Sequence, residues 1–212
     1  MSQMSKQEVT QEIIRQARAK GLLDKDINIL LAIAYIESRF NPDAKNPKSN
    51  AKGVFQYIHN PDNPKYDTWG NTGRLGYRSD PNASPFDPYA NIETMINQYI
   101  KEIKPKIDKI TDEREAFIRA YKYHHDGGFN KPDTPEYLNT INRYAANDAK
   151  YNFLKHEIEK ILSGKETNIE NTNLNNIAPN NPYYIVQPGH TLSKIAKRYG
   201  VDLNDLINEN RR

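Results

Sequence analysis

The sequence predicts a mainly α-helical domain over residues 1–163, then a flexible Asn-rich linker over residues 164–182, and a small α+β module over residues 183–212. Apolar residues three and four positions apart fill most of the first segment, which is the helical pattern. The composition then changes to seven asparagines between Asn168 and Asn181, with few large apolar residues, as is typical of a linker. A short strand pattern followed by renewed helical spacing marks the second module.

The first two helices are predicted from their start signals and apolar faces. Ser5 and Glu8 form a capping-box pattern, and the helix that they open ends near Gly21. The next helix starts near Asp24 or Asp26 and is apolar around most of its circumference, so we expect it to be central and buried. Its apolar residues are Ile27, Leu30, Leu31, Ile33, Ala34 and Ile36.

From Asn41 to about Pro88 the chain is rich in Pro, Asn, Gly and Asp, which predicts a long loop, and its aromatic residues favour a functional one. Two helical segments follow, the second opening at Thr111. The last helical stretch starts with Thr134 as its N-cap and has a break near Asn147. The apolar positions of these segments are Ile92, Met95, Ile96, Tyr99, Ile100 and Ile103, then Ala116, Phe117, Ala120 and Tyr121, then Leu138, Ile141, Tyr144, Ala145, Ile161 and Leu162.

Composition narrows the functional classes. The 212 residues carry a net charge of only +3, which suits an anionic polymer as partner but forms no basic stripe of the kind that binds nucleic acid. There is no cysteine, which excludes disulfides, Cys-ligated zinc and thiol catalysis. The N-terminus lacks the apolar core of a secretory signal, and no segment is long and apolar enough to span a bilayer. We expect a monomer that inserts into no membrane and needs no cofactor.

Glu37 is the first candidate for chemistry, because it ends an otherwise apolar helix that stops before Pro42. Helical geometry places it on an apolar stripe with Leu30, Ile33 and Ala34. Burial and the negative pole of the helix dipole both disfavour the ionised carboxylate, so both raise its pKa towards the range that a general acid needs near neutral pH. The structural alternative is a glutamate that reaches solvent or pairs with a cation such as Arg39.

Glu37 also belongs to a pair of motifs. Residues 37–42 read Glu-Ser-Arg-Phe-Asn-Pro, residues 51–56 read Ala-Lys-Gly-Val-Phe-Gln, and Thr68-Trp69 follows. This pair resembles the soluble lytic transglycosylase family, particularly its phage-encoded members, in which a Glu-Ser-x-Phe-x-Pro helix end precedes an Ala-x-Gly-Leu-Phe-Gln type loop. The resemblance implies a lysozyme-like α domain over about Ser5 to Leu162.

The resemblance implies an activity and a partner. The partner is the glycan strand of peptidoglycan, and the bond cleaved is the β-1,4 bond between N-acetylmuramic acid and N-acetylglucosamine. Glu37 would protonate the leaving oxygen and then take the proton of the muramic acid 6-hydroxyl, giving a 1,6-anhydro product without the second carboxylate of other glycosidases. Asp62 and Asp67 lie where a second carboxylate could come from, although acids in such turns commonly cap local backbone.

The resemblance further implies substrate-binding residues in the loop and at the next helix, namely Ser49, Gly53, Phe55, Gln56 and Asn91. Gly53 is expected to let the backbone approach the sugar closely, and Gln56 to offer its amide to an N-acetyl group or to Glu37. The structural alternatives are a loop-bracing hydrogen bond from Gln56 and a helix-bracing role for Asn91.

Residues 120–128 correspond to the family's Ala-Tyr-Asn-Ala-Gly motif but depart from it. Alignment at the alanine keeps Tyr121, whereas alignment at the glycine puts His124 in the place of the family tyrosine. These two residues share a helical face, so either could reach Glu37. Tyr144 falls where the family has a cleft tyrosine, its structural alternative being a core aromatic. Adjacent histidines on a helix point in different directions, so we expect no metal at the His-His-Asp run.

The tail from Tyr184 resembles a LysM module, which binds glycans that contain N-acetylglucosamine. His190 replaces the usual Asp, and no second strand can be identified before Arg212. We therefore expect a partial module that is weakly stable or partly ordered.

Together these patterns indicate a phage cell-wall-degrading enzyme. It would be made in the host cytoplasm and would reach peptidoglycan through holin release, as an endolysin, or as part of a virion. Two alternatives stay open. One is a hydrolytic lysozyme on the same scaffold, with Asp62 or Asp67 positioning the water, and the other is a largely non-catalytic glycan-binding virion component.

Overall fold

The computed structural model of the chain describes residues 4–70, 72–164 and 193. Its helices are α1 (Lys6–Ala19), α2 (Asp24–Ser38), α3 (Thr72–Leu75), α4 (Pro88–Gln98), the π-helix η1 (Tyr99–Ile103), α5 (Lys104–Ile107), α6 (Glu113–Asp126), α7 (Pro135–Tyr144) and α8 (Asp148–Leu162). Two short strands, β1 (Ala51–Lys52) and β2 (Tyr57–Ile58), pair antiparallel. The prediction of a mainly α fold is confirmed.

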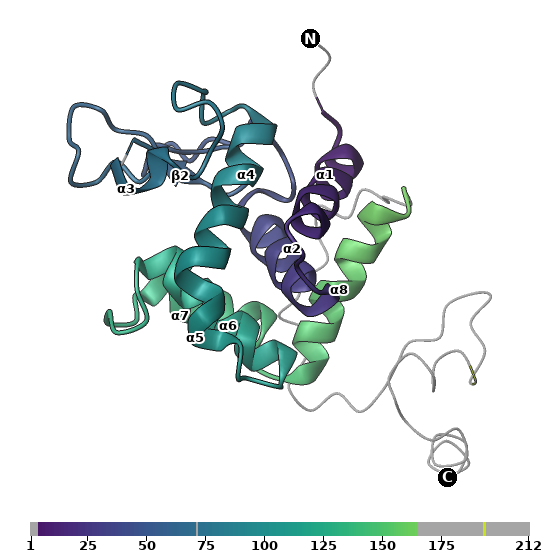
Figure 1. Ribbon diagram of the computed structural model, residues 1–212. Helices are drawn as coiled ribbons and strands as arrows, with labels where there is room; N and C mark the ends of the chain where they lie inside the picture. The colour runs from purple at the N-terminus through teal and green to yellow at the C-terminus, as the bar shows by residue number, and fades with distance from the viewer. Residues whose placement is uncertain (1–3, 71, 165–192, 194–212) are drawn as a thin grey trace. The chain divides into compact units, whose positions relative to one another are not determined.

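The predicted start of α1 and the burial of α2 are also confirmed. The Ser5 hydroxyl accepts a hydrogen bond from the Glu8 N–H (3.2 Å), and the Glu8 carboxylate accepts one from the Ser5 N–H (2.7 Å). Every residue of α2 from Ile29 to Tyr35 is buried, because α1, α6 and α8 all pack against this helix. Figure 1 shows α2 near the centre of the helices.

The helix after the long loop is bent by a proline. α4, η1 and α5 follow one another without a break, and in η1 the Lys104 N–H donates to the Tyr99 carbonyl, five residues earlier. Pro105 has no N–H, and its ring conflicts with the carbonyl four residues before it, so a wider turn ahead of it avoids the clash. Figure 1 shows this bent helix running from the side of α3 and β2 towards α6 and α7.

Three details of the sequence prediction need correction. The segment from Asn41 to Pro88 is not an unbroken loop, because it contains β1, β2 and α3, which are too short to show periodicity. α6 is capped by Asp112 rather than opened by Thr111, since the Asp112 carboxylate accepts a hydrogen bond from Glu115 N–H (2.6 Å). Leu138 is 51% exposed and does not belong to the core.

The predicted break near Asn147 is confirmed, because the Asn147 side chain accepts a hydrogen bond from Lys150 N–H (3.0 Å) and caps α8. The expected linker and second module lie outside the described residues, apart from Gly164 and Ser193.

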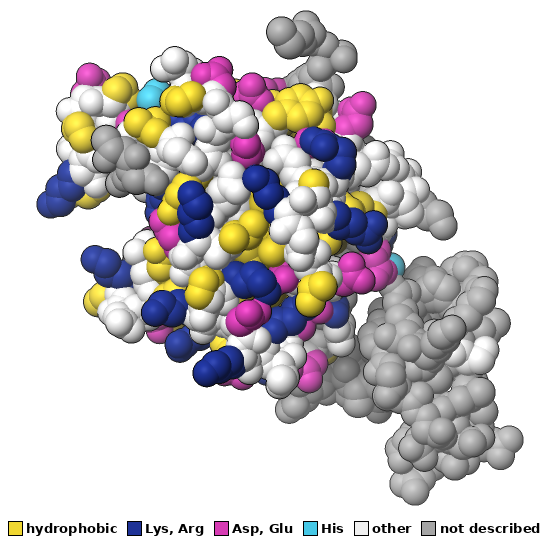
Figure 2. Space-filling view, in the orientation of Figure 1, with side chains coloured by type: hydrophobic (Ala, Val, Ile, Leu, Met, Phe, Trp, Pro, Cys, Tyr) yellow, Lys and Arg dark blue, Asp and Glu magenta, His cyan; other side chains and the backbone are white. Residues whose placement is uncertain are grey.

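Figure 2 shows Lys and Arg side chains mixed with Asp and Glu over the described part of this face, without a stripe of one sign. None of the helices in the described ranges has the length and apolar character that crossing a membrane requires.

Candidate active site

Glu37 lies in the last turn of α2, between the β1–β2 loop and two residues of α6. The next residue, Ser38, donates from its hydroxyl to the Val54 carbonyl (2.8 Å), which ties the helix end to the loop between β1 and β2. The Glu37 side chain is only 16% exposed. Burial raises its pKa to about 7, and an interaction with the Tyr121 hydroxyl partly opposes this rise. A carboxyl group with this pKa is about half protonated at neutral pH, so it can donate a proton there.

Both α6 residues that the sequence left open are beside Glu37. The Tyr121 hydroxyl interacts with the Glu37 carboxyl group and with Thr140, and the tyrosine is 2% exposed. His124 approaches from the same helix face, with its Nε2 3.8 Å from Glu37 Oε1. The predicted shared face of Tyr121 and His124 is therefore observed.

His124 is a neutral neighbour of Glu37. Burial lowers the pKa of the imidazole to about 3, so the ring carries no charge at neutral pH. Its Nε2 is 3.1 Å from the Phe55 carbonyl oxygen, and a carbonyl can only accept, so Nε2 must carry the hydrogen. The ring also meets the rings of Phe55 and Tyr57 edge-on, with centroids 6.4 and 5.8 Å away. His124 thus helps to bury Glu37 without supplying a positive charge that would favour its ionised form.

Arg39 contacts tyrosines and not Glu37. Its guanidinium donates to the hydroxyl groups of Tyr35 and Tyr144, the latter at 3.2 Å, and lies 4.3 Å from the centre of the Tyr35 ring. Among the described contacts, the alternative pairing of Glu37 with Arg39 is not found. Tyr144 is 8% exposed, and its hydroxyl is held near the end of α2 by this arginine.

Asn91 holds the loop that faces Glu37. This fully buried side chain accepts from the Phe55 N–H (2.9 Å) and donates to the carbonyls of Pro85 (2.9 Å) and Lys52 (3.4 Å). A Cβ at Gly53, which has φ +77°, would overlap the Pro85 carbonyl and the Asn91 amide. The glycine is therefore required by packing against Asn91. The Asn91 side chain holds the loop, whereas the structural alternative expected it to brace the start of its helix.

The remaining predicted loop residues have local roles. The Gln56 side chain donates to the carbonyls of Gly53 (2.9 Å) and Ala44 (3.1 Å), which is the bracing alternative. The Phe55 ring is fully buried. Ser49 is exposed in the turn before β1, and its hydroxyl accepts from Ala51 N–H (3.4 Å). Substrate contacts of these three side chains stay predictions.

Backbone strain gathers around the same loop. Within the described ranges, the non-glycine residues with positive φ are Arg39, Phe40, Asn50 and Gln56, with φ between 50° and 61°. They flank the end of α2 and the β1–β2 loop. Side chains larger than glycine rarely adopt this conformation, and residues that do so often gather at functional sites.

Neither candidate second carboxylate acts on Glu37 in the described structure. Asp67 is buried, accepts from Gly70 N–H (2.6 Å) and lies 3.5 Å from His59 Nδ1, which is local capping of the turn. Asp62 is exposed. The causes of the raised Glu37 pKa include no carboxylate. In the part of the chain that the structure describes, no three potential metal-ligating His, Asp or Glu side chains gather.

Comparison with protein families decides the identity of this arrangement. The protein family described as "Transglycosylase SLT domain" matches residues 12–125 of the chain. This range includes α2, the β1–β2 loop and most of α6. The chain belongs to this family. The mainly helical structure agrees with a lysozyme-like SLT domain, and residues 184–212 match a LysM domain. Neither the curated proteins nor the solved structures that were compared gave a match.

Membership in the SLT family supports a peptidoglycan-degrading function of the lytic transglycosylase type, and both domains indicate binding to peptidoglycan. The matched range contains Glu37, Tyr121 and His124, whereas Tyr144 lies beyond it. Sequence reasoning missed Ser38 and Thr140 as supports of the site. Ser38 follows Glu37 directly in the motif and could have been noticed, but nothing in the sequence distinguishes Thr140 from any other helical threonine.

Proposed function

We propose that the SLT domain cleaves the β-1,4 bond between N-acetylmuramic acid and N-acetylglucosamine by a transglycosylase reaction that forms 1,6-anhydro ends. Glu37 is the proposed catalytic residue. The observation that supports this most is a carboxyl group whose pKa is raised to about 7 by burial, with no carboxylate among the causes of that shift.

In the first step, the protonated Glu37 gives its proton to the glycosidic oxygen as the bond to the anomeric carbon breaks. Glu37 is then a carboxylate, and it can act as a base towards the muramic acid 6-hydroxyl. The carboxylate removes that proton while the 6-oxygen bonds to the anomeric carbon. Glu37 is protonated again at the end, so one carboxyl group serves as acid and as base.

The surroundings of Glu37 suit both protonation states. The neutral His124 ring lies 3.8 Å from Glu37 and helps to bury it, which favours the protonated acid. The Tyr121 hydroxyl interacts with Glu37 and stabilises its carboxylate form, which the second step needs. Tyr144, held by Arg39, is the proposed sugar-facing hydroxyl on the side of α7.

Product analysis tests the proposal. Purified peptidoglycan is digested with the full chain, and the muropeptides are analysed by mass spectrometry. We expect 1,6-anhydromuramic ends, whose mass is lower by one water than that of a hydrated reducing end. Reducing ends alone would instead support the hydrolytic lysozyme alternative, and undigested wall would support the non-catalytic glycan-binding alternative.

We also propose that residues 1–163 form the catalytic domain, residues 164–182 a linker and residues 183–212 a partial LysM-like glycan-binding module. The family matches at residues 12–125 and 184–212 are consistent with this division. A chain that ends at residue 163 should keep its activity on soluble glycan fragments and bind less to intact walls. Loss of both would contradict the division.

Finally, we propose a role in phage infection, because the loop after Glu37 resembles that of phage-encoded family members. Neighbouring genes for a holin would support an endolysin, and genes for tail proteins would support a virion enzyme. Bacterial housekeeping genes on both sides would contradict a phage role.

A further inference from the structure

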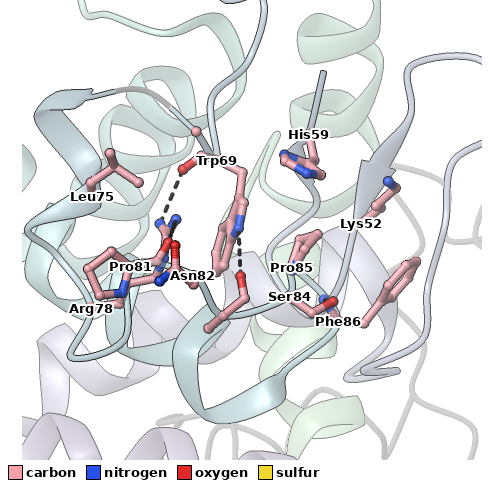
Figure 3. Close-up of a pocket in the computed structure, with 12 residues that line it drawn as sticks. Lys52, His59, Trp69, Leu75, Arg78, Pro81, Asn82, Ser84, Pro85 and Phe86 are labelled. Carbon is pink, nitrogen blue, oxygen red and sulfur yellow. Dashed lines mark hydrogen bonds between the residues drawn. The ribbon is translucent and has the colours of Figure 1, made fainter. Parts of the chain in front are cut away.

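A pocket lies beside the β1–β2 hairpin, built on the long segment before α4. Its volume is about 440 Å³. Figure 3 shows its wall: Trp69 stands in the middle, with Lys52, His59 and Phe86 on the hairpin side and Arg78 with Asn82 on the other. This pocket does not include Glu37, Tyr121 or His124.

The charges that line this pocket have one sign. Lys52, His59 and Arg78 are basic, and no Asp or Glu is among the described residues that line it. Lys52 Nζ lies 5.8 Å from the centre of the Phe86 ring. A ligand with negative charge therefore matches the wall better than a neutral or cationic one.

Arg78 is a buried cation without an acidic partner. The residue is 5% exposed. No carboxylate oxygen of the described residues lies within 4.0 Å of its guanidinium nitrogens, the distance limit for an ion pair. Its guanidinium donates to the carbonyls of Trp69 (3.1 Å) and Pro81 (3.0 Å) and stacks 3.9 Å from the Trp69 ring centre, while its Nε has no hydrogen-bond partner in the described structure. Burial lowers the pKa of this guanidinium, and Asp67 and Asp80 oppose the shift from a longer range. A buried positive charge of this kind is stabilised when an anion arrives.

His59 adds a second polar atom without a hydrogen bond. Its Nδ1 is buried, and the nearby Asp67 Oδ2 is 3.5 Å away, which is an ion pair if the ring is protonated. The other wall residues include apolar side chains, namely Trp69, Leu75, Pro81, Ala83, Pro85 and Phe86. The pocket thus combines positive charge with apolar surface.

The pocket is close to the candidate active site along the chain. Lys52 lies two residues before Val54, a stretch that spans at most about 7 Å. The Val54 carbonyl accepts the hydrogen bond of Ser38, the neighbour of Glu37. A polymer bound at Glu37 can therefore extend to the hairpin that carries Lys52.

We propose that this pocket binds a carboxylate of the peptide stem of peptidoglycan, an inference that rests on the proposed function at Glu37. Every stem carries carboxylates for the basic wall and alkyl side chains for the apolar wall. The phosphate of a teichoic acid would match the charge but not the apolar residues, so we favour the peptide. The pocket then selects glycan strands that still carry their stems.

Calorimetric titration of the full-length Glu37→Gln variant with a synthetic stem peptide tests this pocket without cleavage. The peptide contains no sugar, which removes any contribution from glycan binding. We expect measurable affinity for the peptide with free carboxylates and at least about tenfold weaker binding of the same peptide with amidated carboxylates, the loss typical of charge-assisted contacts.

Two lysine variants locate the effect. Lys52→Gln should weaken the binding of the free-acid peptide by about tenfold, because it removes one cation from the wall. Lys48→Gln, an exposed lysine in the preceding turn that does not line the pocket, should leave the affinity unchanged. Equal effects of both variants, equal affinity for free and amidated peptides, or tighter binding of poly(glycerol phosphate) would each overturn the proposal.

A kinetic comparison separates this proposal from the proposed function. The wild-type chain is assayed on glycan strands with stems and on strands from which the stems have been removed. We expect a lower KM for the strands with stems, and a smaller ratio between the two KM values in Lys52→Gln. Cleavage with equal KM values contradicts the pocket alone. Absence of cleavage on both substrates contradicts the proposed function, and the peptide titration then still decides the pocket.

Discussion

The two walls around Glu37 are built in different ways. On the α6 side, Tyr121 and His124 stand on one helix, which is held together mainly by hydrogen bonds between neighbouring turns of its own backbone. On the hairpin side, the loop depends on distant side chains, since Asn91 holds Phe55 from 36 residues away and His124 holds the same residue from 69 residues away. A helical wall tolerates the loss of a single side chain better than a loop wall whose backbone groups depend on one amide.

Backbone strain differs in the same direction. Among the described residues, the non-glycine positions with positive φ lie between Arg39 and Gln56, and the helical wall has none. Strain of this kind persists only where surrounding contacts fix the backbone. The loop wall therefore depends on tertiary contacts that the helical wall does not need.

The largest expected effect comes from Glu37 itself, the residue between the two walls. Glu37→Gln should lower glycan cleavage about a thousandfold or more, because an amide cannot give or take the proton. Release of soluble fragments from labelled peptidoglycan measures this loss. Glu115→Gln, on the exposed face of α6, is the matched control and should keep full activity. Comparable activity of both variants would remove Glu37 from the mechanism.

Asn91→Ala should break the loop wall. It leaves the buried Phe55 N–H and Pro85 carbonyl without their partner, at a cost of about 3 kcal/mol in the free energy of unfolding. Urea unfolding measures this cost, and the activity of the folded fraction should also fall. Asn97→Ala, which removes one hydrogen bond from α4 to Tyr77, should cost about 1 kcal/mol and spare activity. Equal losses of activity in Asn91→Ala and Asn97→Ala would contradict a special role of the loop wall.

The burial of Glu37 should also appear as a pH-dependent stability. Its pKa is about 7 in the folded state against an ordinary value of 4.5, so between these values the folded chain keeps a proton that the unfolded chain has released. Stability therefore falls as the pH rises through this window. One pKa unit corresponds to about 1.4 kcal/mol, so the cost above the window is about 3 kcal/mol.

Glu37→Gln has no such cost. It should be more stable than the wild type by up to about 3 kcal/mol near pH 8 and by little near pH 4, as measured by urea unfolding at both pH values. The same stability difference at the two pH values would show that Glu37 has an ordinary pKa.

The pH dependence of kcat should show how His124, on the α6 side, affects the pKa of Glu37. The rate should fall about tenfold per pH unit above about pH 7, as Glu37 loses its proton. His124→Ala admits water and should move this fall to lower pH by about one unit, whereas His124→Phe keeps the site dry and should leave it near 7. An unchanged profile in His124→Ala would show that this ring does not control the burial of Glu37.

The smallest effect is expected far from both walls. Ser5→Ala removes the capping box of α1 and should cost about 1 kcal/mol in the free energy of unfolding, with no change in kcat. Thermal unfolding and the cleavage assay check the two parts. A change in kcat would show that the stability of α1 affects the active site.

The sequence was a good guide where structure is local. The capping box at Ser5, the break at Asn147 and the burial of α2 all follow from patterns within a few residues. The exposed Leu138 shows the limit of this reasoning, because helical spacing gives a face but not what covers it. β1 and β2 contain two residues each and leave no periodicity to find.

Sequence by itself determined the family, most of the longer helices and the position of Glu37 at the end of an apolar helix, since each depends on residue type and short spacing. Tertiary structure decided the rest. It brought both Tyr121 and His124 to Glu37, it turned Arg39 to the tyrosines, and it made Asn91 a brace for the loop. These outcomes depend on which buried polar group finds a partner far along the chain, and spacing along one segment carries no information about such partners.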